Sequence, residues 1–113
     1  MSAKSKNLQE LMDLIGSKYV FNKENYPKMD DSCTETKQMF AIVHSNFHMQ
    51  KSLGKIAEVC EEYDHKDNRT HQGITKVEEA IVKMFINTLK LAEELGFSAE
   101  ELFERVEQFY KDR

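Results

Sequence analysis

The sequence predicts an all-α fold. Two observations support this prediction: turn-forming residues are sparse, and apolar residues follow helical spacing. The 113 residues include one proline and four glycines, whereas strand-rich small domains consume such residues in their many tight turns. Apolar residues recur at steps of three and four in four segments, which is the period of an amphipathic helix. We therefore expect residues 1–113 to form one four-helix bundle with a long second helix.

The N-terminal part, about residues 7–31, is expected to hold a short helix and a loop. One apolar face runs along the first helix, formed by Leu8, Leu11, Met12, Ile15 and Tyr19. Residues 21–31 include Asn-Tyr-Pro and Asp-Asp, which are typical of a connecting loop. Aromatic side chains in this loop could cover a pocket.

The core helices are expected in residues 32–111, and capping patterns mark their starts. A Ser or Thr followed three residues later by Glu satisfies exposed backbone N–H groups at a helix start; the pairs are Ser32–Glu35, Thr75–Glu78 and Ser98–Glu101. Residues 64–73 are polar and predict a hairpin loop between a helix of roughly 30 residues and the next. Gly96 is placed to end the third helix in a left-handed conformation.

Charge and composition exclude several classes of protein. The formal charge is −4 and the sequence pI about 5.6, so we expect no nucleic-acid partner, since such proteins concentrate basic residues. No apolar run approaches the roughly 20 residues that cross a bilayer, and the N-terminus lacks a secretory signal, so no membrane partner is expected. Cys33 and Cys60 form no C-x-x-C pair, which favours reduced thiols and a cytoplasmic location.

The third predicted helix is apolar around most of its circumference. Its apolar residues are Ile81, Val82, Met84, Phe85, Ile86, Leu89, Leu91, Ala92 and Leu95. A helix that is apolar on all sides is buried on all sides. Either the other helices wrap it completely, or a second copy of the chain covers one face. We favour a homo-oligomer, a dimer or a tetramer, because four short helices supply few atoms for wrapping.

The second helix carries a polar stripe beside its apolar residues. The stripe recurs at steps of three and four and contains His44, His48, Lys51, Lys55, Glu58, Glu62 and His65. We assign to the core the neighbouring residues Ile42, Met49, Leu53, Ile56, Cys60 and Tyr63, and a second apolar set, Phe40, Val43, Phe47 and Ala57, lies elsewhere around the helix. A charged stripe is also typical of a plain solvated face, and both interpretations stay open.

Parts of this stripe could bind a metal ion. His44 and His48 are one turn apart, as in helical zinc sites, although this spacing also arises by chance. Carboxylates suit Mg²⁺, and those within reach are Glu58, Glu61, Glu62 and Glu79. The competing explanation for acidic residues at the start of the third helix is ordinary helix capping.

Residues 47–110 resemble the MazG-type all-α nucleotide pyrophosphohydrolases, which are related to dimeric dUTPases and phosphoribosyl-ATP pyrophosphohydrolases. The stretch LKLAEELGFSAEELFERV, residues 89–106, carries the resemblance best. It implies a Glu-x-x-Glu on one helix and a Glu-x-x-Asp on the next that hold Mg²⁺. In that family the metal activates water to split the α–β phosphoanhydride of a nucleotide.

The sequence departs from this metal motif. The register of KIAEVCEEY places Glu-x-x-Glu at Lys55 and Glu58, and the Leu-Gly turn places Glu-x-x-Asp at Ala80 and Lys83. Only Glu58 matches the family pattern, and no shifted register supplies the final Asp. Lysines repel a dication but bind phosphate directly, so the resemblance implies the family's fold with a rewritten site.

Two functions follow as hypotheses. In the first, a nucleotide or another phosphorylated small molecule binds at a lysine-containing site; the ligand-binding residues are His44, Lys51, Lys55, Lys83 and Asn87, with His48 or Glu58 as general base for any hydrolysis. In the second, the protein is a catalytically inactive helical oligomerisation or interaction module. The lysines then form salt bridges with Glu58 and its neighbours.

Overall fold

The described residues form four helices and no strand, which confirms the all-α prediction. The computed structural model describes residues 7–65 and 71–111. The helices are α1 (Leu8–Lys18), α2 (Thr34–His65), α3 (His71–Glu94) and α4 (Ala99–Lys111). At 32 residues α2 is the longest, as the sequence predicts.

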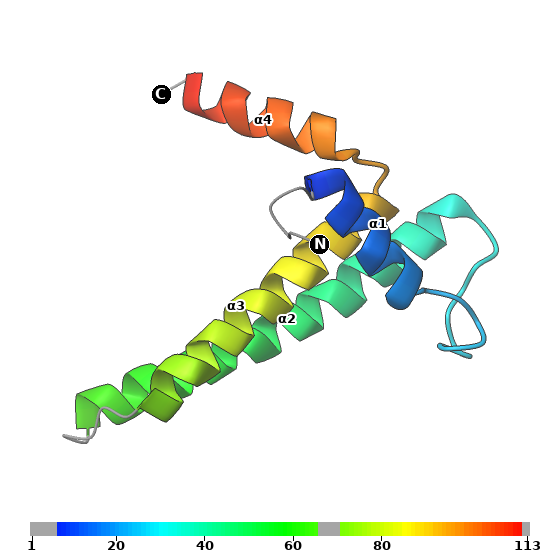
Figure 1. Cartoon of the computed structure of the whole chain (residues 1–113). Coiled ribbons are helices and arrows are strands. Elements are labelled where there is room, and N and C mark those ends of the chain that lie inside the picture. The colour runs from blue at the N-terminus through cyan, green and yellow to red at the C-terminus, as the bar shows by residue number, and fades with distance from the viewer. Residues whose placement is uncertain (1–6, 66–70, 112–113) are drawn as a thin grey trace.

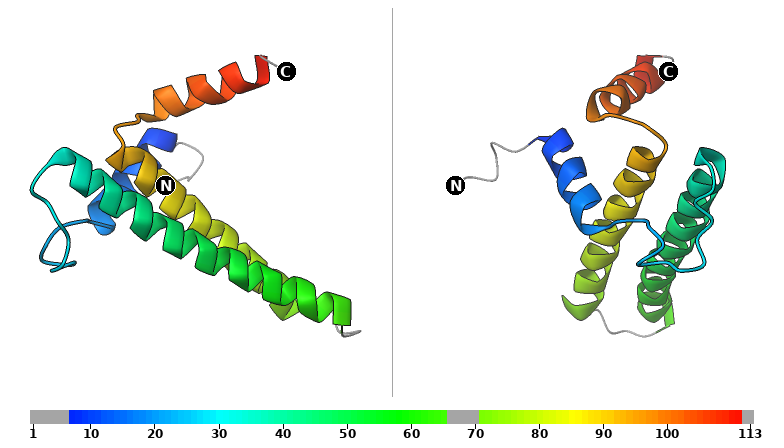
Figure 2. Two further views of the ribbon diagram at one scale, coloured as in Figure 1. Left: turned by 180° about the vertical axis from the view of Figure 1, so that it is seen from behind. Right: turned by 90° about the vertical axis from the view of Figure 1, so that its right-hand side faces the viewer.

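The two long helices form an antiparallel pair, and the other two lie near one end of it (Figure 1). The pair α2 and α3 makes the most extensive contact in the fold, and α1 packs against α3. Seen from the side, α3 lies between α1 and α2, while α4 crosses above them (Figure 2). Helix α4 packs against α1 and leads away from the body of the molecule to the C-terminus.

Capping geometry at the ends of α1, α3 and α4 follows from local sequence. Asn7 and Glu10 form a capping box that opens α1. Gly96 has φ 89°, and the Phe97 N–H donates to the Ala92 carbonyl at 2.9 Å, a pattern that closes a helix through a left-handed residue. The Glu101 N–H donates to the Ser98 Oγ at 3.2 Å, which confirms the predicted box at α4.

Two predicted helix starts are wrong. Helix α2 begins at Thr34, and it is the Thr36 hydroxyl that donates to the Cys33 carbonyl at 3.0 Å. Helix α3 begins at His71, so Thr75 lies inside its second turn. Helical residues thus occupy both ends of the predicted loop at residues 64–73, and residues 66–70 of that loop lie outside the described residues.

The buried core is small and lies where α1 meets α3. Met12 and Ile15 of α1 are buried against Leu89 and Ala92 of α3. Partly buried residues pack around these four: Leu8, Leu11, Tyr19, Ile86, Phe97, Ala99 and Leu102. The apolar face predicted for the first helix is therefore confirmed.

The fully buried side chains of α2 are small, which corrects the predicted core stripe of this helix. Ala41, Ser45 and Ser52 are buried in the structure. Of the predicted stripe, Leu53 and Tyr63 are more than half exposed. Larger apolar side chains of the predicted stripe therefore stay in contact with solvent in the single chain.

Helix α3 is not wrapped by the other helices. Ile81 and Val82 are 55% and 57% exposed, although α3 lies between α1 and α2. No residue of α4 within Ala99–Lys111 is fully buried. Over the described part of the chain, none of the helices is long and apolar enough to pass through a membrane.

Candidate functional site

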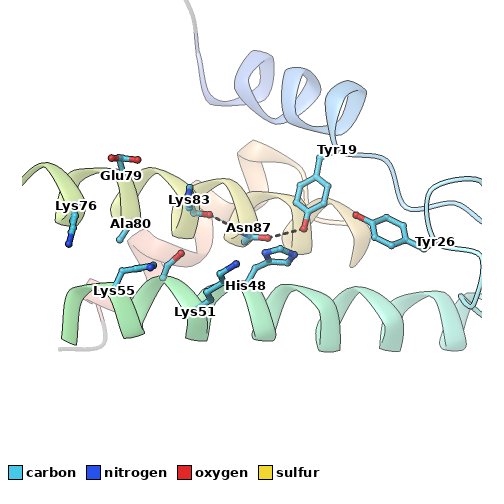
Figure 3. A pocket seen from close by; sticks show the side chains of 11 residues that line it. Tyr19, Tyr26, His48, Lys51, Lys55, Lys76, Glu79, Ala80, Lys83 and Asn87 are labelled. Atoms are coloured by element: carbon cyan, nitrogen blue, oxygen red, sulfur yellow. Dashed lines mark hydrogen bonds between the residues drawn. The ribbon is translucent and has the colours of Figure 1, made fainter. Parts of the chain in front are cut away.

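A pocket of about 500 Å³ lies between α2 and α3, close to the segment that follows α1. Helix α2 contributes His48, Lys51, Ser52 and Lys55, and α3 contributes Lys76, Glu79, Ala80, Lys83 and Asn87. Tyr19 and Tyr26 border one end (Figure 3). The volume is within the usual range for a small-molecule site, roughly 300–1,000 Å³.

Helical spacing explains why these residues meet. Lys51 and Lys55 are one turn apart on α2, and Lys76 and Lys83 are two turns apart on α3, so each pair points from a single side of its helix. The ammonium groups of Lys51 and Lys55 extend from α2 toward α3, and that of Lys76 extends toward α2 (Figure 3). The pocket is therefore strongly positive, with four lysines and one glutamate among its lining residues.

Asn87 is held in one orientation at the tyrosine end of the pocket. Its side chain is 6% exposed, and its Oδ1 accepts a hydrogen bond from the Tyr19 hydroxyl at 3.0 Å. Its Nδ2 donates to the Lys83 carbonyl at 2.8 Å. Both bonds are drawn in Figure 3. Because buried polar groups need such partners, Tyr19 fixes the orientation of the buried Asn87 amide.

An aromatic cluster lies behind the tyrosine end. The His44 ring stacks on Phe40 at a centroid distance of 5.4 Å and meets Tyr26 and His48 at 4.9 and 4.5 Å. Burial lowers the pKa of His44, and electrostatic repulsion between its protonated ring and that of His48 lowers it further. His44 is thus favoured in its neutral form within an aromatic environment.

The ionisation of Tyr19 is also displaced. Burial raises the pKa of its hydroxyl to about 12, and Tyr26 adds to the rise through repulsion between the two phenolates. The hydroxyl therefore stays protonated at neutral pH and remains a hydrogen-bond donor to Asn87.

A buried lysine anchors the segment that carries the two tyrosines. Lys90 is 3% exposed, and its Nζ lies 3.1 Å from Glu93 and 2.9 Å from Glu94. The same Nζ lies 4.9 Å from the centre of the Phe21 ring, a distance suited to a cation–π interaction. Lys90 thus joins α3 to the segment after α1 and has a structural role.

The structure brings together most, but not all, of the residues predicted for the site. His48, Lys51, Lys55, Lys83 and Asn87 line the pocket, together with Glu79. His44 lies in the aromatic cluster, outside the lining. The other carboxylates predicted for it, Glu58, Glu61 and Glu62, are exposed and also lie outside the lining. Lys83 is exposed at the pocket's edge.

Sequence reasoning missed four polar residues that line the pocket: Tyr19, Tyr26, Ser52 and Lys76. Lys76 could have been found, because it lies seven residues before Lys83 and therefore on the same side of α3. Tyr19 was assigned to the core face of α1, and its hydroxyl extends beyond that face to the pocket. Nothing local in the sequence indicates that Tyr26 folds back onto α2.

The lining residues do not fit Mg²⁺. A hard cation of this kind needs oxygen ligands, normally including more than one carboxylate when phosphate is also bound. The pocket offers the carboxylate of Glu79 alone, and its lining also includes four lysines. Within residues 7–65 and 71–111, no three His, Cys, Asp or Glu side chains are grouped so that they could hold a metal ion.

Comparisons of this chain with protein-family models, with curated proteins and with solved structures find no match.

Proposed function

We propose that the protein binds a phosphorylated small molecule, with a nucleotide as the best candidate, in the pocket between α2 and α3. The convergence of Lys51, Lys55, Lys76 and Lys83 on one cavity carries this proposal. Four lysines that line one cavity repel one another when it is empty, and a polyphosphate offsets this repulsion while gaining direct contacts. A solvated charged stripe gives no reason for lysines of two helices to line the same cavity.

The two ends of the pocket favour a ligand with two chemically different parts. The lysines suit a phosphate chain, and Tyr19 and Tyr26 offer aromatic surface at the opposite end. Asn87, with its amide oriented by two hydrogen bonds, is placed between them. A planar base joined to phosphates combines both requirements.

The proposal includes a distant relationship to the MazG-type pyrophosphohydrolases, with lysines at positions where that family carries carboxylates. It does not include a metal-dependent hydrolytic step, because the pocket supplies a single carboxylate. His48 is the candidate base if any hydrolysis occurs. An inactive interaction module remains the second candidate, and the exposed apolar side chains of α2, α3 and α4 favour it.

The test is a titration of the full chain with pyrophosphate, with tripolyphosphate, with nucleoside triphosphates and with the corresponding nucleosides, each in EDTA and in Mg²⁺. Binding is followed by calorimetry and by thermal shift. We expect polyphosphates to bind in EDTA and nucleosides to bind far more weakly. Release of pyrophosphate that requires Mg²⁺ or Mn²⁺ would contradict the proposed site chemistry, and no response to any phosphate would leave the interaction module.

Matched lysine variants locate the binding site. Lys55→Gln and Lys76→Gln each remove one charge from the pocket, and each should weaken binding by about 1 kcal/mol, or about fivefold. Lys37→Gln is the control, because Lys37 is exposed on α2 and lies outside the lining. Equal effects of all three variants would indicate unspecific attraction and not a site.

A further inference from the structure

The four pocket lysines have no partner of opposite charge within the described part of the chain. None of their ammonium groups lies within ion-pair distance of a described carboxylate, although Glu79 belongs to the same lining. Lys90, by contrast, is paired with two glutamates. Four lysines and one glutamate give the lining a formal charge of +3 while His48 is neutral. The charge of these lysines is therefore left for a bound anion.

Three of these ammonium groups extend into the space between the two long helices. Lys51 and Lys55 extend from α2 toward α3, and Lys76 extends from α3 toward α2 (Figure 3). A lysine binds phosphate as a point charge placed against the phosphate oxygens. Mg²⁺ takes the same oxygens, because it is bound by substrate phosphates together with one or two carboxylates. The lysines and Mg²⁺ therefore compete for one set of ligand atoms.

A metal-bound ligand fits this lining poorly for two reasons. Mg²⁺ cancels two of the negative charges that attract a polyphosphate to the lysines, and the ion itself is repelled by the ammonium groups. Among the described residues the lining contains one carboxylate, that of Glu79. Glu79 lies three residues after Lys76 and four before Lys83, so it shares one side of α3 with two cations. The pocket therefore distinguishes a bare polyphosphate from its magnesium complex.

We infer that the pocket selects phosphorylated ligands in their metal-free form, and that Mg²⁺ is an antagonist which withholds adjacent phosphates from the lysines. The inference rests on the proposed function, since it concerns the ligand of the same pocket. It also narrows the class of ligand. Phosphoryl groups at separate positions of a molecule do not chelate one ion in a small ring, so they keep their charge in the presence of Mg²⁺. Such ligands are favoured over those with a phosphate chain.

Equilibrium dialysis of the full chain with two matched probes tests the inference. Inorganic pyrophosphate has adjacent phosphoryl groups, whereas propane-1,3-diol bisphosphate has the same two groups separated by three carbon atoms. Each probe is measured in EDTA and in excess Mg²⁺, and KCl keeps the ionic strength equal. We expect excess Mg²⁺ to raise the Kd of pyrophosphate by about tenfold or more, and that of the bisphosphate by less than about threefold.

The outcomes separate this inference from the proposed function. Pyrophosphate that binds as tightly in Mg²⁺ as in EDTA would overturn the inference and leave the phosphate site intact. An equal loss of both probes in Mg²⁺ would also overturn it, because the ion would then act on the protein and not on the ligand. A failure of both probes to bind in EDTA would overturn the proposed function, and the inference with it.

A charge-reversal variant tests whether the lysines cause this selection. Lys55→Glu replaces an ammonium group of the pocket with a second carboxylate, so the free ligand is repelled and its metal complex is tolerated. We expect the Kd of pyrophosphate in EDTA to rise by about tenfold or more, and its ratio between Mg²⁺ and EDTA to fall below about threefold. Lys37→Glu is the control, because Lys37 is exposed on α2 outside the lining and should keep the native ratio. A native ratio in Lys55→Glu would overturn the inference.

Discussion

The hydrogen bond between Tyr19 and Asn87 offers a quantitative test of how the pocket is built. Tyr19→Phe removes one oxygen and leaves the ring, so the packing against the core of α1 and α3 is retained. The Asn87 Oδ1 then loses the partner that lies 3.0 Å away, in a side chain that is 6% exposed. A buried acceptor left without a partner costs about 1–3 kcal/mol.

We therefore expect Tyr19→Phe to lower the free energy of unfolding by about 1–2 kcal/mol, because partial access of water to the pocket offsets part of the loss. The melting temperature should fall by about 4–8 °C per kcal/mol. Denaturant unfolding followed by circular dichroism measures the free energy directly. Tyr26→Phe is the control, since the Tyr26 hydroxyl lies at the longer distance of 3.5 Å from His44, and its removal should cost under about 0.5 kcal/mol.

A double-mutant cycle separates this bond from other effects of the substitution. In the Asn87→Ala background the amide is absent, so Tyr19→Phe should lose most of its cost, with a coupling energy of about 1 kcal/mol. Additive effects in the cycle, or a Tyr19→Phe variant as stable as the native chain, would refute the account of how Asn87 is positioned. Loss of polyphosphate affinity in Tyr19→Phe without loss of stability would refute it as well.

Three further predictions concern pH and two glycines. Since the pKa of Tyr19 is raised to about 12, the contribution of this tyrosine to stability is complete below pH 10 and is lost as the pH rises toward 12. Absorbance titration should find one tyrosine that ionises at higher pH than the others, and this late ionisation should be absent in Tyr19→Phe. The pKa of His44 is lowered by burial and by His48, so the contribution of neutral His44 to stability should be complete above about pH 6.5 and should fall as the pH drops below this value. His44→Phe should weaken this dependence of stability on pH. An acid unfolding profile that is unchanged in this variant would contradict the prediction. Gly96→Ala places a side chain at φ 89° and should lower the free energy of unfolding by at least about 1 kcal/mol. Gly54→Ala has open space around the added carbon and should stabilise α2 by about 0.5–1 kcal/mol. Chemical denaturation compares the two variants, and equal effects would contradict the helix-end geometry at Gly96.

The local features of this fold are determined by short stretches of sequence. The period of the apolar residues predicts four helices, and the Ser98–Glu101 box and Gly96 place the end of α3 and the start of α4 correctly. These features depend on contacts within a few residues of one another. The helix starts that failed were judged from capping patterns alone. At Thr75 the capping pattern lies inside the helix, which begins at His71.

The candidate site, like the fold, can be predicted from the sequence only where its residues lie close together along the chain. Spacing on a single helix predicts that Lys51 and Lys55 lie together, and the resemblance implies that Lys83 faces them. Neither predicts Tyr19 or Tyr26, because the segment after α1 reaches the pocket only by folding back onto α2 and α3. The carboxylates at Glu58, Glu61 and Glu62 share a helix with the lysines, yet they lie outside the pocket lining.

The sequence by itself determined the all-α class, the amphipathic first helix and the line of cations on α2, since each is a property of residues close along one chain segment. The tertiary structure decided which side of α2 is interior. Burial depends on what lies opposite a side chain, and the packing around α2 buries Ala41, Ser45 and Ser52 while leaving Leu53 exposed. The same packing closes a pocket around lysines of two helices.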